Sequence, residues 1–388
     1  MLLRNAHIVL PDRITEPSSV LIEGDRIARI FAAEPPSSST GNGAAIDLGG
    51  LTLWPGFIDI HIHGAVGIDT MEATSEGLLR IADFLARQGV TSWLPTLVPA
   101  AIDQYQNALK AIRECLGQLS NDSGNARVLG VHYEGPFVNS EQCGALHREH
   151  FRAFGSAADL DELPVINIPG AIHMMTLAPE IDGGIDLVKE LDRRGWVTSI
   201  GHTRATLTTL DRASEAGARH MTHFMNAMTP LHHRTVGAVG WGLLHDDVTV
   251  DLIADGIHVD RAILQLILRN KTTERVSLIS DAIAATGKGD GNYQIWGETI
   301  EVKNGRTKNS SGAIAGSVIT MLDAVRTMMS LGFSESDAAR MAATNPARLL
   351  RIDHECGSIE AGKRADFVAL DHNLNVRATI IAGQIKHY

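Results

Sequence analysis

Length, composition and charge restrict what this chain can be. Its 388 residues carry a formal net charge of −11 and 44% hydrophobic side chains, enough for a large globular core. An acidic chain without clustered Lys or Arg is not expected to bind nucleic acid or an anionic membrane. The chain has few cysteines, and they are widely spaced, which indicates reduced thiols and not disulfides; they are Cys115, Cys143 and Cys356. With no signal-peptide pattern and no apolar run long enough to span a bilayer, we expect a cytoplasmic protein.

Both ends of the chain are predicted to form short strands that together build one small β-sandwich domain from residues 1–54 and 351–388. Turns are predicted at Gly24-Asp25 and Ala382-Gly383, and a surface loop from Pro35 to Gly43. The predicted strands are Leu2–Leu10, Ser19–Glu23, Arg26–Phe31, Ala45–Leu53, Asp366–Leu370 and Ala378–Ile381.

Residues 55–350 alternate between strand-like and helix-like patterns, which is typical of a parallel (β/α)8 barrel. The helix patterns include Ser75–Gln88, with Ser75 as N-cap and Gly89 just beyond the end, and Asp186–Arg194, which Gly195 ends. A doubly wound open sheet is the alternative architecture. The predicted strands are Phe57–His63, Val90–Leu97, Val128–Glu134, Ile172–Leu177, Val197–His202, His220–Phe224, Val248–Ala254 and Val276–Asp281.

An insertion of roughly Gly289–Gly316 follows the eighth predicted strand. Strand patterns and turn-forming residues within the insertion predict a β-hairpin. Helix patterns follow the insertion. The predicted elements are strands Tyr293–Trp296 and Thr299–Lys303, a hairpin turn at Asn304-Gly305, a helix Ser317–Ser330, and helix starts at Ser334 and Asn345-Pro346.

His61 and His63 alternate with apolar residues at the end of the first barrel strand. Side chains two residues apart on a strand point to the same side, so both imidazoles face one way. Such a pair is either two hydrogen-bonded core histidines or part of a metal site, since imidazole is the commonest metal ligand.

Four further polar residues, Glu134, His202, His223 and Asp281, lie at the ends of other predicted strands. Taken singly, Glu134 and Asp281 could cap a loop and a helix, and the histidines could be satisfied core residues. The carboxyl ends of barrel strands converge on one face, however, and this face carries the active site of such barrels. Together the residues therefore predict a polar site.

Nitrogen and oxygen donors of this kind suit Zn²⁺, with Fe²⁺ or Mn²⁺ as alternatives. Either two ions share the site with Glu134 as a bridge, or one ion uses Glu134, His202 and His223. A divalent ion makes hydroxide available near neutral pH, and Asp281 is then left to take the proton and pass it to a leaving group. This chemistry favours hydrolysis.

Several stretches, in order along nearly the whole chain, resemble the amidohydrolase superfamily and within it the N-acetylglucosamine-6-phosphate deacetylase family. These stretches are PGFIDIHIHG (Pro55–Gly64), HYEGPF (His132–Phe137), GHT (Gly201–Thr203), HFMNAM (His223–Met228), IADGIHV (Ile253–Val259), SDA (Ser280–Ala282), AGS (Ala315–Ser317) and GSIEAGKRAD (Gly357–Asp366).

The resemblance implies a metal-dependent hydrolase that removes acetate from N-acetylglucosamine-6-phosphate in amino-sugar catabolism and leaves glucosamine-6-phosphate. Glu134, His202 and His223 match the family's metal ligands, and Asp281 matches its general acid/base. His61 and His63 are replaced in some members that hold one metal, so a second ion here is optional.

The resemblance also implies a set of substrate-binding residues and a homodimer in which Arg234 reaches the neighbouring site. A guanidinium suits phosphate, and an acidic protein needs a local cation for a phosphosugar. The matching positions are Ala145, Asn226, Ala227, Arg234, His258, Ile314, Ala315 and Gly316.

Two departures from the family pattern concern the substrate. The family often has His two places after Gly144, whereas here Ala145-Leu146-His147 puts it one place later, so that His147 takes that role only by a loop adjustment. After Arg234 an acidic residue and Pro are common before the Gly, but this chain has Thr235-Val236. The alternatives are therefore a deacetylase of the galactosamine epimer and another amidohydrolase acting on a cyclic amide or N-acyl substrate.

Overall fold

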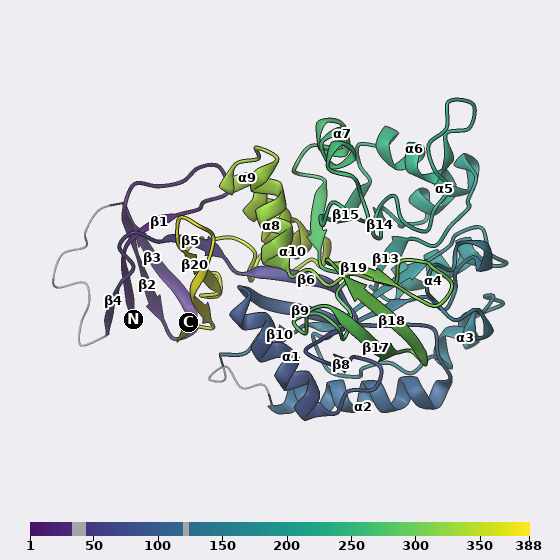
Figure 1. Ribbon diagram of the computed structural model, residues 1–388, viewed down its shortest axis with the longest axis horizontal. Coiled ribbons are helices and arrows are strands. Elements are labelled where there is room, and N and C mark those ends of the chain that lie inside the picture. The colour runs from purple at the N-terminus through teal and green to yellow at the C-terminus, as the bar shows by residue number, and fades with distance from the viewer. Residues whose placement is uncertain (33–43, 119–123) are drawn as a thin grey trace.

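A closed parallel barrel occupies the centre of the chain, and a small sheet lies beside it (Figure 1). The computed structural model describes residues 1–32, 44–118 and 124–388. A bridge between Ile62 and Ala282 joins the last barrel strand to the first, which confirms the barrel and excludes the open doubly wound sheet. In hydrogen-bonded order the strands are β6 (Phe57–Ile62), β9 (Val90–Leu97), β11 (Gly130–Glu134), β12 (Ile172–Leu177), β13 (Val197–Ile200), β14 (His220–Met221), β15 (Thr249–Ile253) and β16 (Val276–Ile279).

Helices between the strands cover the outside of the barrel. The first begins after Thr74, whose side chain accepts a hydrogen bond from the Gly77 N–H, so the N-cap is Thr74 and not the predicted Ser75. Leu78, Ile81 and Leu85 lie on one face of this helix and are buried against the strands. The helices are α1 (Ser75–Arg87), α2 (Ile102–Gln118), α3 (Ala157–Asp161), α4 (Gly184–Arg193), α5 (Leu207–Glu215), α6 (Gly237–Leu244), α7 (Arg261–Lys271), α8 (Met321–Ser330), α9 (Glu335–Ala339) and α10 (Asn345–Leu349).

Strands from both ends of the chain form the small sheet, as predicted. One core of buried side chains from both ends lies within it. The predicted strand Ala45–Leu53 is instead two strands, because the chain turns at Gly49 and Gly50. The predicted loop Pro35–Gly43 lies outside the described residues. The strands are β1 (Leu2–Ile8), β2 (Ser18–Glu23), β3 (Arg26–Phe31), β4 (Ala45–Asp47), β5 (Thr52–Pro55), β20 (Phe367–Leu370), β21 (Val376–Ile381) and β22 (Gln384–His387).

The insertion after β16 forms the predicted hairpin, with a third strand that was not predicted. Asn304 and Gly305 both have positive φ angles, as a tight hairpin turn requires. The predicted helix from Ser317 begins later, at Met321, because the Ser317 backbone and hydroxyl bond instead to Asp281 and Ser280. The three antiparallel strands are β17 (Gly291–Ile295), β18 (Glu298–Lys303) and β19 (Arg306–Lys308).

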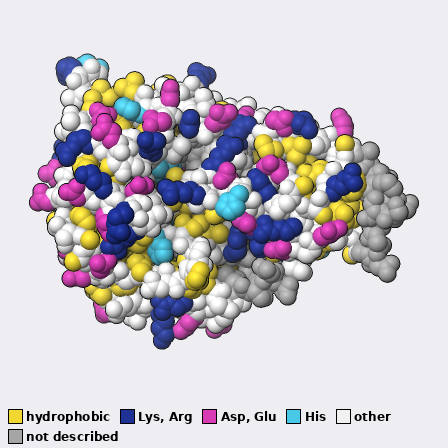
Figure 2. Space-filling model, turned by 180° about the vertical axis from the view of Figure 1, so that it is seen from behind, with side chains coloured by type: hydrophobic (Ala, Val, Ile, Leu, Met, Phe, Trp, Pro, Cys, Tyr) yellow, Lys and Arg dark blue, Asp and Glu magenta, His cyan; other side chains and the backbone are white. Residues whose placement is uncertain are grey.

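The molecular surface carries mixed charge on the face drawn in Figure 2, where acidic and basic side chains alternate and hydrophobic side chains are scattered. In the described part of the chain, no helix combines the length and the apolar character that crossing a bilayer requires.

Candidate metal centre

Three predicted site residues lie just beyond the carboxyl ends of barrel strands and have a left-handed backbone. The φ angles of His202, His223 and Asp281 are 48°, 32° and 49°. Residues other than glycine rarely adopt this conformation, and when they do they cluster at functional sites. The strands are therefore shorter than predicted: β13, β14 and β16 end at Ile200, Met221 and Ile279.

Glu134, His202 and His223 form one buried group of metal donors. Glu134 Oε1 lies 2.9 Å from His202 Nε2 and 3.0 Å from His223 Nε2, and the two nitrogens are 3.0 Å apart. The Nδ1–H of His202 donates to the carbonyl of Gln142 at 2.7 Å, which leaves its Nε2 lone pair for a cation. Buried imidazole and carboxylate atoms that face one another in this way fit a divalent transition ion.

His61, His63 and Asp281 form a second buried group beside the first. The two Nε2 atoms are 3.1 Å apart, and Asp281 Oδ1 lies 3.4 Å from that of His61 and 3.2 Å from that of His63. Glu134 contacts this group as well, with Oε1 3.6 Å from His61 Nε2 and Oε2 3.3 Å from His63 Nε2. The residues present therefore also fit a second ion, with Glu134 between the two positions.

The charges of the two groups depend on one another. Burial alone would raise the pKa of Glu134 and Asp281, but His61 and neighbouring ring nitrogens outweigh it and hold both pKa values below their ordinary range. Burial alone would lower the pKa of His63, yet Asp281 and Glu134 raise it to about 10, and Glu134 raises the pKa of His223 to about 9. The carboxylates thus attract positive charge, which protons supply in the absence of metal.

Two buried aspartates that sequence analysis did not single out position the donors. Asp59 accepts a 2.5 Å hydrogen bond from Ser280 Oγ, next to Asp281, and burial raises the pKa of Asp59 to about 6. Asp251 accepts from the backbone N–H of His223. Both lie within buried strands, where an acidic residue is rarely found without a partner. An acidic residue inside an apolar strand pattern is therefore the signal by which the sequence could have identified them.

A cavity of about 160 Å³ adjoins the donors. Trp296, which follows β17 and was not assigned to the site, lines this cavity and packs edge-on against His63 with ring centroids 5.2 Å apart. His258 donates from Nδ1 to Asp255 at 2.6 Å, which leaves Nε2 for a substrate. The predicted substrate-binding residues that line the cavity are Ala145, Asn226, Ala227, His258, Ile314 and Gly316.

Three other predicted substrate-binding residues do not line this cavity. His147 donates from Nε2 to the Trp296 carbonyl at 3.0 Å and lines a separate cavity of about 560 Å³. Ala315 is fully buried between Ile314 and Gly316. Arg234 is exposed between β14 and α6, where its guanidinium contacts His233.

Comparisons with known proteins identify the family of this chain. The model of the Amidohydrolase family matches residues 52–386. The N-acetylgalactosamine-6-phosphate deacetylase of Escherichia coli O157:H7 is 37% identical over 92% of this chain and 93% of its own. The N-acetylglucosamine-6-phosphate deacetylase of Bacillus subtilis (strain 168) is 34% identical over 99% of this chain and 96% of its own.

A solved structure agrees as well. The crystal structure of N-acetylglucosamine-6-phosphate deacetylase from Pasteurella multocida has a TM-score of 0.90 and 30% identity, and the match covers 100% of this chain and 99% of that one. The chain therefore belongs to the amidohydrolase family and, within it, to the N-acetylglucosamine-6-phosphate deacetylase family.

Proposed function

We propose that this protein hydrolyses N-acetylglucosamine-6-phosphate to glucosamine-6-phosphate and acetate, as a step of amino-sugar catabolism. The observation that carries the proposal is the buried carboxylate of Asp281, which lies with His61 and His63 beside the other group of metal donors, in a cavity that also contains His258 and Asn226. Deacetylases of both amino-sugar phosphates are similar to this chain over nearly its full length.

Glu134, His202 and His223 would hold one divalent ion, and His61 and His63 would hold a second with Asp281 and Glu134 beside them. When bound, a divalent ion supplies Lewis acidity toward the amide carbonyl and toward water. Zn²⁺ suits these donors best, and Fe²⁺ or Mn²⁺ are the alternatives.

Asp281 acts first as general base and then as general acid. Its lowered pKa keeps it ionised at neutral pH, so it accepts a proton from the water that attacks the acetamide carbonyl carbon. The resulting carboxylic acid then donates this proton to the departing amine as the C–N bond breaks, which releases acetate. Asp59 positions the adjacent backbone through Ser280 during both transfers.

The phosphate end of the substrate is assigned to His258 and Asn226 of the same chain and to Arg234 of a second copy. Arg234 is exposed and does not line the cavity of its own chain, which supports a role across the interface of a homodimer. We place the protein in the cytoplasm, where the free thiols of Cys115, Cys143 and Cys356 stay reduced.

Acetate release from a panel of sugars tests this function. The panel contains N-acetylglucosamine-6-phosphate, its galactosamine and mannosamine epimers, and unphosphorylated N-acetylglucosamine, each with metal-loaded enzyme. We expect the highest kcat/KM with the first compound. Equal values with and without phosphate would contradict the roles given to Arg234 and His258, and no acetate from any compound would reject the function.

The galactosamine epimer is the second candidate substrate. The relative with 37% identity carries that activity in its name, whereas the relative with 34% identity acts on the gluco compound. The same panel separates the two, because the preferred epimer has the higher kcat/KM.

A further inference from the structure

A second cavity, of about 740 Å³, lies at the opposite end of the barrel from the metal centre. Thr198, His220, Thr249 and Ser277 line it, and each of them lies at or near the start of its strand, β13, β14, β15 or β16. Catalytic residues of such barrels lie at the other ends of the strands. The deacetylation described above therefore leaves this cavity without a role.

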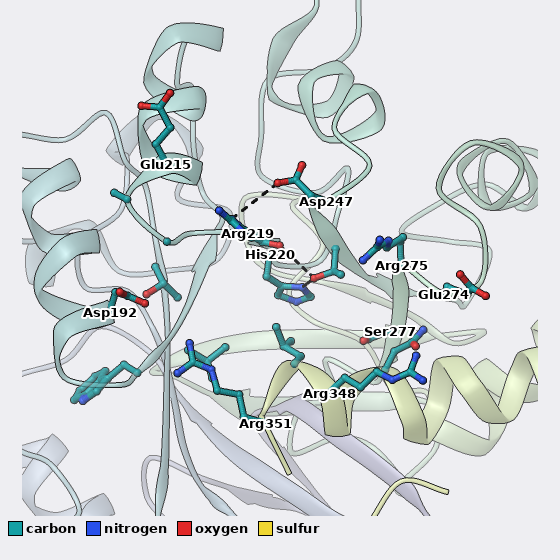
Figure 3. A pocket seen from close by; sticks show the side chains of 18 residues that line it. Asp192, Glu215, Arg219, His220, Asp247, Glu274, Arg275, Ser277, Arg348 and Arg351 are labelled. Atoms are coloured by element: carbon teal, nitrogen blue, oxygen red, sulfur yellow. Dashed lines mark hydrogen bonds and ion pairs between the residues drawn. The ribbon is translucent and has the colours of Figure 1, made fainter. Parts of the chain in front are cut away.

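Four arginines and four acidic residues line the cavity, but most of these arginines are not paired with an acid in the part of the chain that the structure describes. Among the described residues, Arg275, Arg348 and Arg351 have no carboxylate oxygen within 4.0 Å, and Arg219 is 3.9 Å from Asp247. Figure 3 shows these arginines around Ser277 and His220, whereas Glu215 and Glu274 lie toward the margins of the view. Guanidinium groups form short, charge-assisted hydrogen bonds with phosphate and carboxylate oxygens, often in pairs.

Two buried polar atoms on the cavity wall have no partner within the described chain. They are Thr198 Oγ1 and Asn345 Oδ1, in side chains of residues that are each only 6% exposed. The amide nitrogen of Asn345 donates to the carbonyls of Thr273 and Val276, which fixes the orientation of the amide group. Buried polar atoms normally have a hydrogen-bond partner, and polar groups of a bound molecule can supply the partners that these two atoms lack.

We propose that this cavity binds a small phosphorylated metabolite that carries hydroxyl groups, at a site separate from the reaction site. The phosphate contacts Arg275, Arg348 and Arg351, and the hydroxyl groups contact Thr198 and Asn345. The volume lies in the range of small-molecule sites. Asp192, Glu215, Asp247 and Glu274 also line the cavity, so the phosphate is placed only at the three arginines that contact no carboxylate among the described residues.

Calorimetric titration of the full-length, metal-loaded enzyme with glucose 6-phosphate tests the proposal. This probe has the phosphate and the hydroxyl groups but no acetamide, so it binds without being consumed. Arg275→Ala combined with Arg348→Ala removes two phosphate contacts, and Arg269→Ala combined with Arg377→Ala removes the same charge elsewhere on the surface. Arg275→Lys with Arg348→Lys preserves the charge in case the alanine pair unfolds.

We expect two binding events per subunit, one at the reaction site and one at this cavity. In the alanine pair the Kd of one event rises about tenfold or more, since a hydrogen bond to a charged group contributes about 1.5–3 kcal/mol. Deacetylation kinetics stay unchanged, the lysine pair also weakens that event, and the Arg269/Arg377 pair binds normally. A single event, or two events that both survive in the alanine pair, would overturn the proposal. Inorganic phosphate that binds as tightly as glucose 6-phosphate would overturn the assignment of the hydroxyl contacts.

Discussion

The two ends of the barrel place different chemistry on the same strands. At the carboxyl ends, buried histidines and carboxylates line a cavity of about 160 Å³. At the amino ends, exposed arginines, acidic side chains and short polar side chains line a cavity of about 740 Å³. Among the described residues, both groups of metal donors lie at the carboxyl ends, so the larger cavity is not the one with the metal-binding chemistry.

One short connection joins the two ends. His220 lines the larger cavity, and its Nε2 donates to Asp251 Oδ2 at 3.1 Å. The other oxygen of Asp251 accepts from the backbone of His223, a residue of the metal centre. The strand order thus places a buried carboxylate between the two regions, where it satisfies a group from each of them.

Asp281→Asn is the change with the largest expected effect, and it tests whether the chemistry belongs to one end alone. The amide cannot accept and return the proton, so kcat should fall by about 10²–10⁴-fold while metal content, measured by elemental analysis, stays at one ion or more per subunit. Asp247→Asn at the opposite end is the matched control and should leave kcat unchanged. Near-normal turnover by Asp281→Asn would reject its acid/base role.

Removal of single donors distinguishes the two groups within the metal centre. His202→Ala should abolish tight metal binding and with it nearly all activity, because His202 belongs to the group expected to hold the indispensable ion. His61→Ala should lower the metal content from two ions to one, or leave it at one, and keep measurable activity. Elemental analysis after dialysis reports both results, and the opposite pattern would reverse the assignment of the two groups.

His258→Asn tests the phosphate end of the same cavity. Loss of one hydrogen bond to a charged oxygen should raise KM for the phosphorylated substrate by about 10- to 100-fold and change kcat much less. The KM for the unphosphorylated sugar should not change. A comparable rise for both sugars would mean that His258 does not contact the phosphate.

Metal affinity should rise with pH. The pKa values of His63 and His223, about 10 and about 9, mean that both rings hold protons at neutral pH without metal. An ion must displace these protons, so affinity increases by about tenfold per pH unit for each proton released and falls as the solution is acidified. Competition with a chelating dye between about pH 6 and pH 8 measures the slope, and a flat profile would contradict the protonation assigned here.

The sequence allowed the barrel to be predicted because its strands and helices alternate in hydrophobic period. The same reasoning located Glu134, His202, His223 and Asp281, since strand ends converge in this fold. It could not show that three of them adopt left-handed backbones, which depend on hydrogen bonds to distant residues such as Asp251. Trp296 was not predicted as a site residue for a similar reason, because only the folded hairpin places its ring against His63.

The small sheet also determines when the chain can finish folding. β5 pairs with β20. Residues Thr52–Pro55 therefore cannot form these hydrogen bonds until Phe367–Leu370, more than 300 residues later in the chain, have been synthesised. Until then, one edge of β5 and part of the core of the small sheet remain open to other chains. Thr379 then donates to the Ala86 carbonyl of α1 at 2.7 Å and joins the completed sheet to the barrel. Loss of the last strands would therefore leave β5 with an unpaired edge beside an otherwise assembled barrel. We expect such a chain to aggregate during synthesis.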